Sequence, residues 1–187
     1  MADTAPSPEP VLPSRGTTAA AAGTTAARGT TAAPATTEFV ALSTEDLRLW
    51  LPEAMAYYQA ARMRAGDSEA EAVAARQASV DRFFPEGRLI AGQFVFAIIA
   101  DGEDVGWLWL GPWSEGGDQW WVWDIHVREP HRRHGFGRAA MEFAERVAKE
   151  HGAPTLGLNV FAYNLPAIEL YESLGFVAAS LHLTKDL

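Results

Sequence analysis

The chain has no cysteine and little positive charge. Disulfides, thiolate metal sites and a cysteine nucleophile are therefore excluded. Lysine and arginine number 15 against 24 aspartates and glutamates, a formal net charge of −9, and this balance argues against general nucleic-acid binding. No apolar run approaches the roughly 20 residues that cross a membrane. The first residues hold no apolar segment of signal-peptide type, so we expect a cytoplasmic protein that does not act at a membrane.

The length and composition suffice for one domain, because 187 residues with 48% hydrophobic side chains can form a buried hydrophobic core. Residues 1–37 differ in kind, being dominated by alanine, threonine, proline and glycine. The run Gly-Thr-Thr-Ala-Ala begins at Gly16 and again at Gly29. Such a tract cannot bury enough apolar surface to offset its ordering entropy. We therefore predict a low-complexity, disordered tail over 1–37 and a folded domain over 38–187.

Caps, turn signals and hydrophobic periodicity predict the element order β-α-α-β-β-β-α-β-α-β-β. The strands are expected at 38–43, 93–100, 105–110, 119–127 and 155–161, with the last ones between 175 and 187. The helices are expected at 43–66, 67–84, 135–152 and 164–174. This order predicts an α/β (α+β) fold, in which a mixed, mostly antiparallel sheet of about six to seven strands carries helices on both faces.

The most informative segment runs from Val127 to Met141, where a strand ends and two glycines open an amphipathic helix. Unpaired amides and the positive end of the helix dipole make such a helix start a phosphate site. Gly135 and Gly137 let the backbone approach a ligand without a Cβ in the way. Local positive charge comes from Arg128, Arg132, Arg133 and Arg138. A cationic patch on an acidic chain predicts an anionic ligand.

A dinucleotide-binding site is an alternative for this segment, because Gly135-Phe-Gly-Arg-Ala-Ala140 matches G-x-G-x-x-A. That fingerprint should open a βαβ unit and be followed about 20 residues later by an acid for the ribose. Here the preceding strands are linked as hairpins, and Asn159 stands at the corresponding place. The dinucleotide interpretation is therefore the weaker one.

Two motifs resemble the GNAT superfamily of acyl-CoA N-acyltransferases. The first is Arg/Gln-x-x-Gly-x-Gly/Ala, which Arg132-Arg-His-Gly135-Phe-Gly137 satisfies. The second, Asn-x6-Tyr-x3-Gly-Phe, is satisfied by Asn164, Tyr171, Gly175 and Phe176. The resemblance covers about 38–187 in element order and is specific over 121–176. It implies the GNAT fold and an N-acetyltransferase that uses acetyl-CoA as co-substrate without a metal.

The resemblance also implies where coenzyme A binds. Its diphosphate would lie on the loop amides and its pantetheine arm along the strand edge, which requires strand 121–127 to splay from strand 155–161 at a bulge. The residues implied are Ile125, His126 and Val127 on the strand, Arg132, Arg133, His134, Gly135, Phe136, Gly137 and Arg138 on the loop, and Asn164 and Tyr171. Asn164 has a second interpretation as a helix N-cap, which is compatible with binding.

Acyl transfer to an amine needs a base for the amine and a donor for the leaving thiolate. By resemblance Tyr171 is the candidate donor, although it also fits the apolar stripe of its helix. Asp124 and His126 are the candidate bases, and His126 is the better matched by its usual pKa. A water-relayed base is a further alternative. Some relatives that acetylate protein N termini carry glutamate where this chain has Asn159, and an asparagine cannot accept a proton.

Six of the seven tryptophans lie between Trp107 and Trp123. Most are expected in the core, with one or two lining an acceptor pocket beside Trp50 or Tyr58, where aromatic rings would attract a cationic amine. The spacing of His126, His131 and His134 is a weak metal pattern, and we expect no metal. The expected acceptor is a small-molecule amine. The alternatives are a protein N terminus or lysine, and a non-catalytic acyl-CoA sensor. Family members are often dimers, so a homodimer is compatible.

Overall fold

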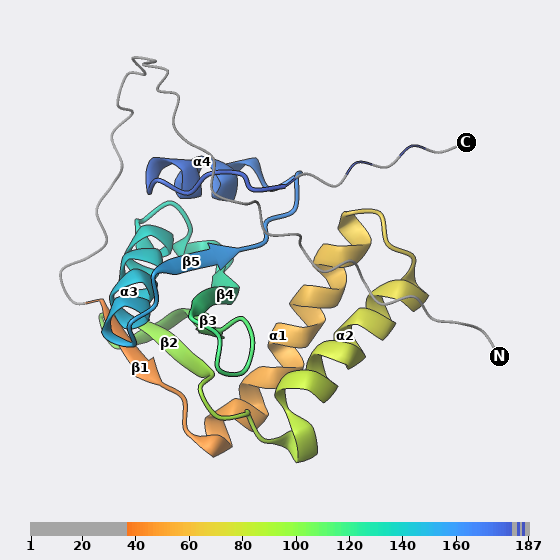
Figure 1. Ribbon diagram of the computed structural model, residues 1–187, viewed down its shortest axis with the longest axis horizontal. Helices are drawn as coiled ribbons and strands as arrows, with labels where there is room; N and C mark the ends of the chain where they lie inside the picture. The colour runs from red at the N-terminus through yellow and green to blue at the C-terminus, as the bar shows by residue number, and fades with distance from the viewer. Residues whose placement is uncertain (1–36, 181–182, 184, 186–187) are drawn as a thin grey trace.

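The computed structural model describes residues 37–180, 183 and 185, so the expected tail over 1–36 lies outside the described residues. The elements follow the predicted order as far as the last helix (Figure 1). The strands are β1 (Glu38–Ala41), β2 (Phe94–Ala100), β3 (Glu103–Pro112), β4 (Gln119–Val127) and β5 (Thr155–Leu158). The helices are α1 (Thr44–Arg64), α2 (Glu69–Phe83), α3 (Phe136–Glu150) and α4 (Leu165–Ser173), with short 3-10 turns at Pro85–Gly87 and Glu129–His131.

The sheet has five strands in the order β1-β2-β3-β4-β5. Every neighbouring pair is antiparallel except β4 and β5, which are parallel because α3 crosses over between them. The mixed, mostly antiparallel sheet is thus confirmed, but the expected six to seven strands were too many for the described residues. Residues 176–180 form no strand. Val177 is 87% exposed there and has no sheet face to cover.

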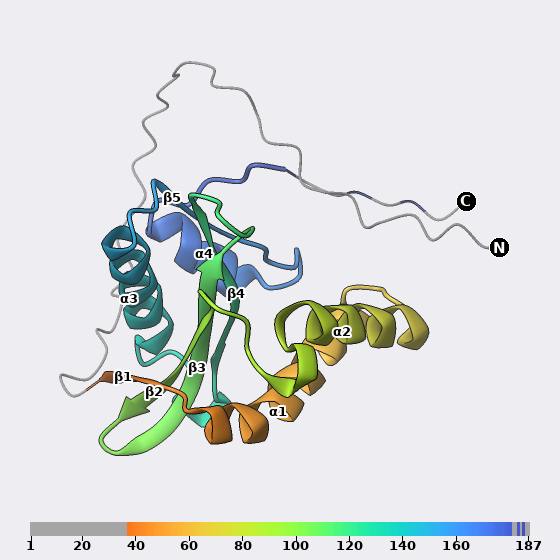
Figure 2. The same ribbon diagram turned by 60° about the horizontal axis from the view of Figure 1, so that its bottom comes forward.

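Helices cover both faces of the sheet, as predicted (Figure 2). On one face α3 and α4 pack on strand residues that include Leu108, Leu110 and Val122. On the other face α1 and α2 cover Val95, Trp107 and Trp109. The period of two along β3 therefore sends alternate side chains into two separate hydrophobic clusters.

The three long helices begin differently, and the difference bears on the site. Both α1 and α2 start with a capping box, in which Ser43 pairs with Asp46 and Ser68 with Glu71. Helix α3 has no side-chain cap, and its N-cap residue Gly135 has a left-handed backbone with φ 89°. The amides at the start of α3 are therefore left for another partner.

Strand β4 pairs with β3 along nearly its whole length but with β5 along only part of it. Its pairing with β3 shifts register between Trp109 and Leu110, so that Trp123 is the extra residue of a bulge. Its pairing with β5 covers only Gln119 to Val122. Strand β5 ends at Leu158 rather than at the expected residue 161 because β4 bends away at the bulge. Strands β4 and β5 therefore splay apart beyond Val122.

Candidate active site

The main-chain amides from Gly135 to Arg138 lie where the chain enters α3, and we call them the amide cradle. Arg133 and Gly135 both have positive φ, 69° and 89°, which turns this segment sharply before the helix. The first intrahelical bond runs from the amide of Ala139 to the carbonyl of Gly135. The amides from Gly135 to Arg138 therefore have no partner within the helix. They lie at the positive end of a 15-residue helix, where an anionic group is stabilised.

Gly137 lies in a tight contact between helices. A Cβ at Gly137 would lie 3.2 Å from Leu170 Cδ2, so the start of α3 and helix α4 are in close contact here. A larger side chain at 137 would push on α4 as well as on any bound ligand. This packing role could not be deduced from the motif alone.

The four arginines near the cradle have different partners. Arg128 bonds to Glu53 at 2.7 Å and to Asp104 at 2.9 Å, so two carboxylates already balance its charge. Arg132 donates from Nε to the carbonyl of Val127 at 3.0 Å, and Arg138 donates to Ser173 Oγ at 2.6 Å. Arg132 and Arg133 are exposed beside the cradle. The predicted positive patch is therefore narrower than the sequence suggested, because Arg128 belongs to a separate ion-pair network.

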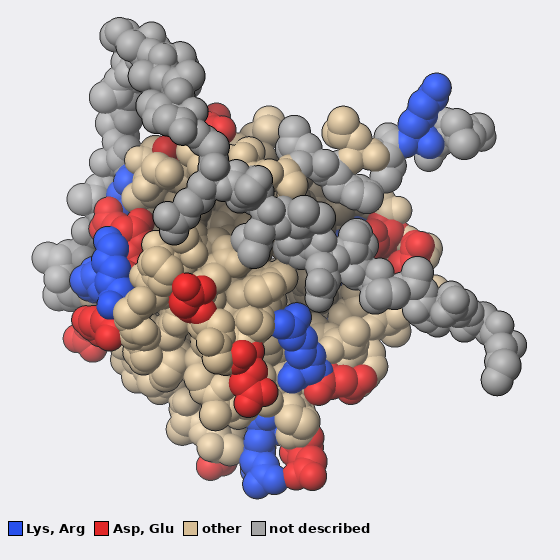
Figure 3. Space-filling model, in the orientation of Figure 1, with Lys and Arg blue, Asp and Glu red and all other residues tan. Residues whose placement is uncertain are grey.

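Charge on the face of the molecule in Figure 3 is mixed, with acidic and basic side chains interspersed rather than gathered by sign. Within the described residues no group of three or more potential ligands is arranged to hold a metal ion. His126, His131 and His134 do not converge: His131 lies 3.5 Å from Glu103, whereas His126 packs between aromatic rings. No described helix is both long and apolar enough to span a bilayer.

The splay leaves part of the β4 backbone at an open edge. The amide of Arg128 donates to Val105 of β3, so by alternation the amides of Asp124 and His126 also face β3. The amides of Ile125 and Val127 face the opposite edge, beyond the last residue that pairs with β5. Of the three strand residues named from the sequence, Ile125 therefore presents its carbonyl and Val127 its amide at this edge, because the Ile125 amide donates to the Asp124 carboxyl and the Val127 carbonyl accepts Arg132 Nε. His126 presents its side chain.

Asp124 lies at the start of the splay. Its Oδ2 accepts the indole N–H of Trp107 at 2.6 Å, and its carboxyl also accepts the amide of Ile125. Burial raises the pKa of Asp124 to about 6, although both hydrogen bonds act in the opposite direction. The carboxyl is thus ionised near neutral pH while remaining a moderately strong base.

Tyr171 of α4 lies near enough to Asp124 to be influenced by its charge. It is 8% exposed and packs against Phe176 with ring centroids 5.9 Å apart. Burial and the negative charge of Asp124 raise the pKa of Tyr171 to about 12. The phenol therefore keeps its proton at neutral pH and can donate a hydrogen bond. The structure brings together Asp124 and Tyr171, which are 47 positions apart in the chain.

His126 is held between aromatic rings. It stacks on Trp107 with centroids 4.3 Å apart and contacts Tyr57 of α1 at 4.2 Å. Burial, with Arg132 and Arg128 nearby, lowers the pKa of His126 to about 4. Its Nε2 is buried without a hydrogen-bond partner. The imidazole is thus neutral at pH 7 and a weaker base than the sequence alone suggested.

Asn164 occupies the N-cap position of α4, but its side chain makes no capping hydrogen bond. Its carbonyl accepts the amides of Ala167 and Ile168, and its own amide donates to Phe161. The N-cap interpretation is therefore correct for the backbone only, and the side-chain amide is not used to cap the helix.

The aromatic residues divide between core and surface. Trp50 is buried in the cluster under α1, and the Tyr58 hydroxyl accepts a bond from Arg62. Trp113 stacks on Trp123 with centroids 5.2 Å apart and contacts Trp121 at 4.4 Å. These last three rings are only partly buried, and Trp123 is the bulge residue next to Asp124. They are better placed than Trp50 or Tyr58 to contact an acceptor.

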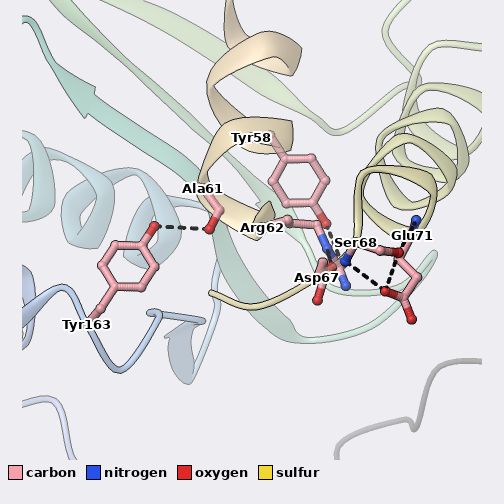
Figure 4. A network of polar contacts seen from close by, with 7 residues as sticks. All are labelled: Tyr58, Ala61, Arg62, Asp67, Ser68, Glu71 and Tyr163. Atoms are coloured by element: carbon pink, nitrogen blue, oxygen red, sulfur yellow. Dashed lines mark hydrogen bonds and ion pairs between the residues drawn. The ribbon is translucent and has the colours of Figure 1, made fainter. Parts of the chain in front are cut away.

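A contact that the sequence did not predict joins α1 to the loop between β5 and α4 (Figure 4). Tyr163 donates its hydroxyl to the carbonyl of Ala61 at 3.2 Å. The guanidinium of Arg64 lies 4.3 Å from the centre of the Tyr163 ring, and Phe161 stacks on the same ring. We call this contact the Tyr163 bridge. It connects the elements on the two sides of the β4–β5 splay.

A pocket lies elsewhere on the α1 face. It encloses about 330 Å³ and is lined in part by Trp50, Glu53, Asp104, Trp107 and Arg128. A second hollow on α1 is lined by Glu53, Ala56, Tyr57 and Ala60, beside His126. Neither pocket includes Asp124 or Tyr171. We place the candidate chemistry at the splay because the perturbed acid–base groups and the open backbone edge meet there.

Known proteins resemble this chain in both sequence and fold. The sequence matches the Acetyltransferase (GNAT) family over residues 50–176. The uncharacterized N-acetyltransferase YycN of Bacillus subtilis (strain 168) is 28% identical over 150 residues, covering 78% of this chain and 96% of YycN. The crystal structure of the Bacillus subtilis YycN protein matches with a TM-score of 0.73 and 27% identity, covering 81% of this chain and 99% of that chain.

Two relatives have named acceptors. Streptothricin acetyltransferase of Streptomyces lavendulae is 34% identical over 96 residues, covering 51% of this chain and 50% of that protein. The ribosomal protein bS18-alanine N-acetyltransferase of Escherichia coli (strain K12) is 41% identical over 64 residues, covering 34% and 43% of the two chains. Since the family match spans more than half of its residues, the chain belongs to the GNAT family of acetyltransferases.

Proposed function

We propose that the protein transfers an acetyl group from acetyl-CoA to a primary amine by direct attack in a ternary complex. One observation carries the proposal: an uncapped helix start, an open strand edge and an acid–base pair occur in the same part of the fold. These are the start of α3, the edge of β4 beyond Val122, and Asp124 with Tyr171. Membership of the GNAT family supports the reaction type. A chain without cysteine cannot form an acyl-cysteine intermediate, which favours direct transfer.

Coenzyme A would bind by its diphosphate and its amide arm. The amides between Arg133 and Arg138 would receive the diphosphate, with the exposed side chains of Arg132 and Arg133 beside it. The carbonyl of Ile125 and the amide of Val127 would bond to the pantetheine amides as an added strand. The side-chain amide of Asn164, which does not cap its helix, would bond to the same arm.

In this proposal Asp124 is the base and Tyr171 the hydrogen-bond donor. The amine nitrogen bonds to the thioester carbon, and Asp124 takes the proton that the nitrogen loses, directly or through one water. The carbon–sulfur bond then breaks, and the sulfur leaves with the electron pair. A phenol of pKa about 12 lies above a thiol of pKa about 8.5, so Tyr171 would stabilise the thiolate chiefly by its hydrogen bond. The lowered pKa of His126 makes this histidine the less effective base.

We propose a small-molecule amine as the acceptor. The support is the Tyr163 bridge, which connects α1 to the β5–α4 loop on the far side of the splay and so narrows that side of the site. A peptide would need an open cleft there. The partly exposed Trp123, which adjoins the ionised Asp124 at the bulge, suits a cationic amine. Acetylation of a protein N terminus is the second candidate, because one relative is a ribosomal-protein alanine N-acetyltransferase.

The experiment is an amine survey with thiol release from acetyl-CoA as the readout. The panel contains polyamines, amino acids, aminoglycosides, streptothricin and a peptide with a free N-terminal alanine. We expect turnover with one class of small amine and at most weak turnover with the peptide. Dominant peptide activity would establish the second candidate. Tight coenzyme A binding without turnover on any amine would favour a sensor, and failure to bind coenzyme A would overturn the proposal altogether.

A further inference from the structure

Trp107 and Trp109 form a pair that the described activity does not use. They share one face of β3 and are both buried, each with 2% of its surface exposed. Each donates its indole N–H to a side chain on a neighbouring strand segment. The partners differ in kind, since Trp107 bonds to the carboxyl of Asp124 and Trp109 bonds to the neutral amide of Gln93. This near-symmetry allows one tryptophan to serve as the control for the other.

The bond to Asp124 is the shorter of the two, at 2.6 Å against 3.2 Å. A short bond of this kind is expected where the acceptor is ionised. Trp107 itself has little freedom to move, because the His126 ring stacks on one face and Trp50 approaches edge-on at 6.3 Å. A donor held this firmly restricts the carboxyl that it bonds to.

We propose that Trp107 is a positioning residue for acetyl transfer: its indole N–H holds the Asp124 carboxyl in the β4–β5 splay and favours its ionised, proton-accepting form. The inference deepens the proposed function and rests on Asp124 being the base. A hydrogen bond to the charged form of an acid stabilises that form, so its loss makes the acid harder to ionise. Trp107 would therefore set both the direction and the ionisation of the base.

Other titratable groups act on the same carboxyl or near it. Tyr171 faces Asp124 from α4, and its own proton is held more tightly because of the Asp124 charge. His126 lies on the same face of β4, where it is influenced by Arg132, Arg128, Glu53 and Asp104. Any measured change in the pKa of Asp124 must therefore be compared with that in a variant that leaves these groups in place. Trp109→Phe does so, because its bond goes to Gln93.

The first experiment compares Trp107→Phe with Trp109→Phe in the full chain, using kcat/KM against pH with one active amine. Losing a hydrogen bond to a charged group should move the acid limb of Trp107→Phe upward by about one to two pH units. At pH 7 its kcat/KM should be about two- to tenfold lower and should recover toward pH 9. Titration of the amine itself cancels in the comparison. The acid limb of Trp109→Phe should stay near pH 6, whatever general loss of packing it suffers.

The second experiment needs no activity, and the titration is followed in the unsubstituted protein. Indole N–H resonances of the ¹⁵N-labelled wild-type protein are followed from pH 4.5 to 8. The Trp107 signal should shift with a midpoint near 6 as Asp124 ionises. The Trp109 signal should not follow that midpoint, and in Asp124→Asn the Trp107 shift should vanish. Assignment of the two signals comes from the two phenylalanine variants, or from selective labelling if one does not fold.

The outcomes separate the inference from the function on which it rests. A wild-type enzyme that turns over amines, with equal acid limbs in the two phenylalanine variants and no titration of the Trp107 signal, would overturn the role of Trp107 alone. A protein in which the Trp107 signal titrates but no amine is acetylated would leave the hydrogen bond in place and overturn the function.

Discussion

At the scale of single residues, the charge of Asp124 has the widest consequences. Burial raises its pKa from an ordinary value of 3.8 to about 6, so the folded protein binds this proton more tightly than the unfolded chain. The resulting stabilisation is complete below pH 3.8 and is lost as the pH rises through 6. Above pH 7 the ionised carboxyl therefore costs folding free energy of about 1–3 kcal/mol, a cost that fits the proposed role of Asp124 as the base.

Asp124→Asn should consequently be more stable and less active than the wild type. Asparagine keeps an oxygen for the Trp107 N–H but carries no charge to desolvate. We expect a melting temperature higher by a few degrees at pH 7.5 and nearly unchanged at pH 4, with turnover at least about 100-fold lower. Thermal unfolding at the two pH values measures the first effect. A variant that is less stable at pH 7.5 would contradict the burial argument.

Tyr171→Phe tests the proposed hydrogen-bond donor to the leaving sulfur. The ring can still pack against Phe176, so the fold should be retained. We expect kcat to fall by about 10²- to 10⁴-fold, with the affinity for coenzyme A changed by less than about threefold. Steady-state kinetics and calorimetry give the two numbers. Equal turnover in the variant would remove Tyr171 from the mechanism.

At the scale of elements, the geometry of the site depends on where β4 leaves β5. The bulge at Trp123 ends their pairing at Val122, and the Tyr163 bridge rejoins the two sides through α1. In the proposed binding mode, the end of the pairing would leave room for the cofactor arm, and the bridge would limit access to it.

Tyr163→Ala should relax the preference for small acceptors. Removing the ring abolishes both the hydrogen bond to Ala61 and the contact with Arg64. We expect the ratio of kcat/KM for a bulky amine to that for a small amine to rise by roughly fivefold, the equivalent of about 1 kcal/mol. Tyr58→Phe is the matched control, because its hydroxyl bonds to Arg62 within α1 and does not cross the splay. An unchanged ratio would show that the bridge does not limit acceptor size.

At the scale of the whole molecule, the proposed cofactor would contact elements from both halves of the domain. Three elements would contact the bound coenzyme A: the start of α3, the open edge of β4 and the start of α4. A ligand that binds only the folded state stabilises all of them together. The net charge of −9 makes the local amide cradle the more important for holding a diphosphate.

Saturating coenzyme A should therefore raise the melting temperature. At about 100 times its dissociation constant it contributes about 2.7 kcal/mol, or roughly 5–10 °C for a domain of this size. Differential scanning calorimetry measures the shift. Pantetheine, which lacks the diphosphate, is the control and should have a much smaller effect at the same concentration. Equal effects of the two compounds would argue against the cradle at the start of α3.

Much of the architecture was predictable because its signals are local. Ser43 and Ser68 marked the starts of α1 and α2, and alternation placed Trp107 and Trp109 on one face of β3. The end of β5 was not predictable, because it depends on a bulge in another strand. The relative strengths of Asp124 and His126 as bases were not predictable either, since desolvation and neighbouring charge set their pKa values.

By itself the sequence determined the order of elements up to α4, the glycine-opened helix and the family, because caps, periodicity and motif spacing are properties of neighbouring residues. Only the tertiary structure decided that Trp107 bonds to Asp124, that Tyr163 reaches Ala61 and that His126 is enclosed by rings. Those contacts follow from strand register and helix packing. Strand register and helix packing both bring together residues that are far apart in the chain. The burial that results shifts the pKa values of Asp124 and His126.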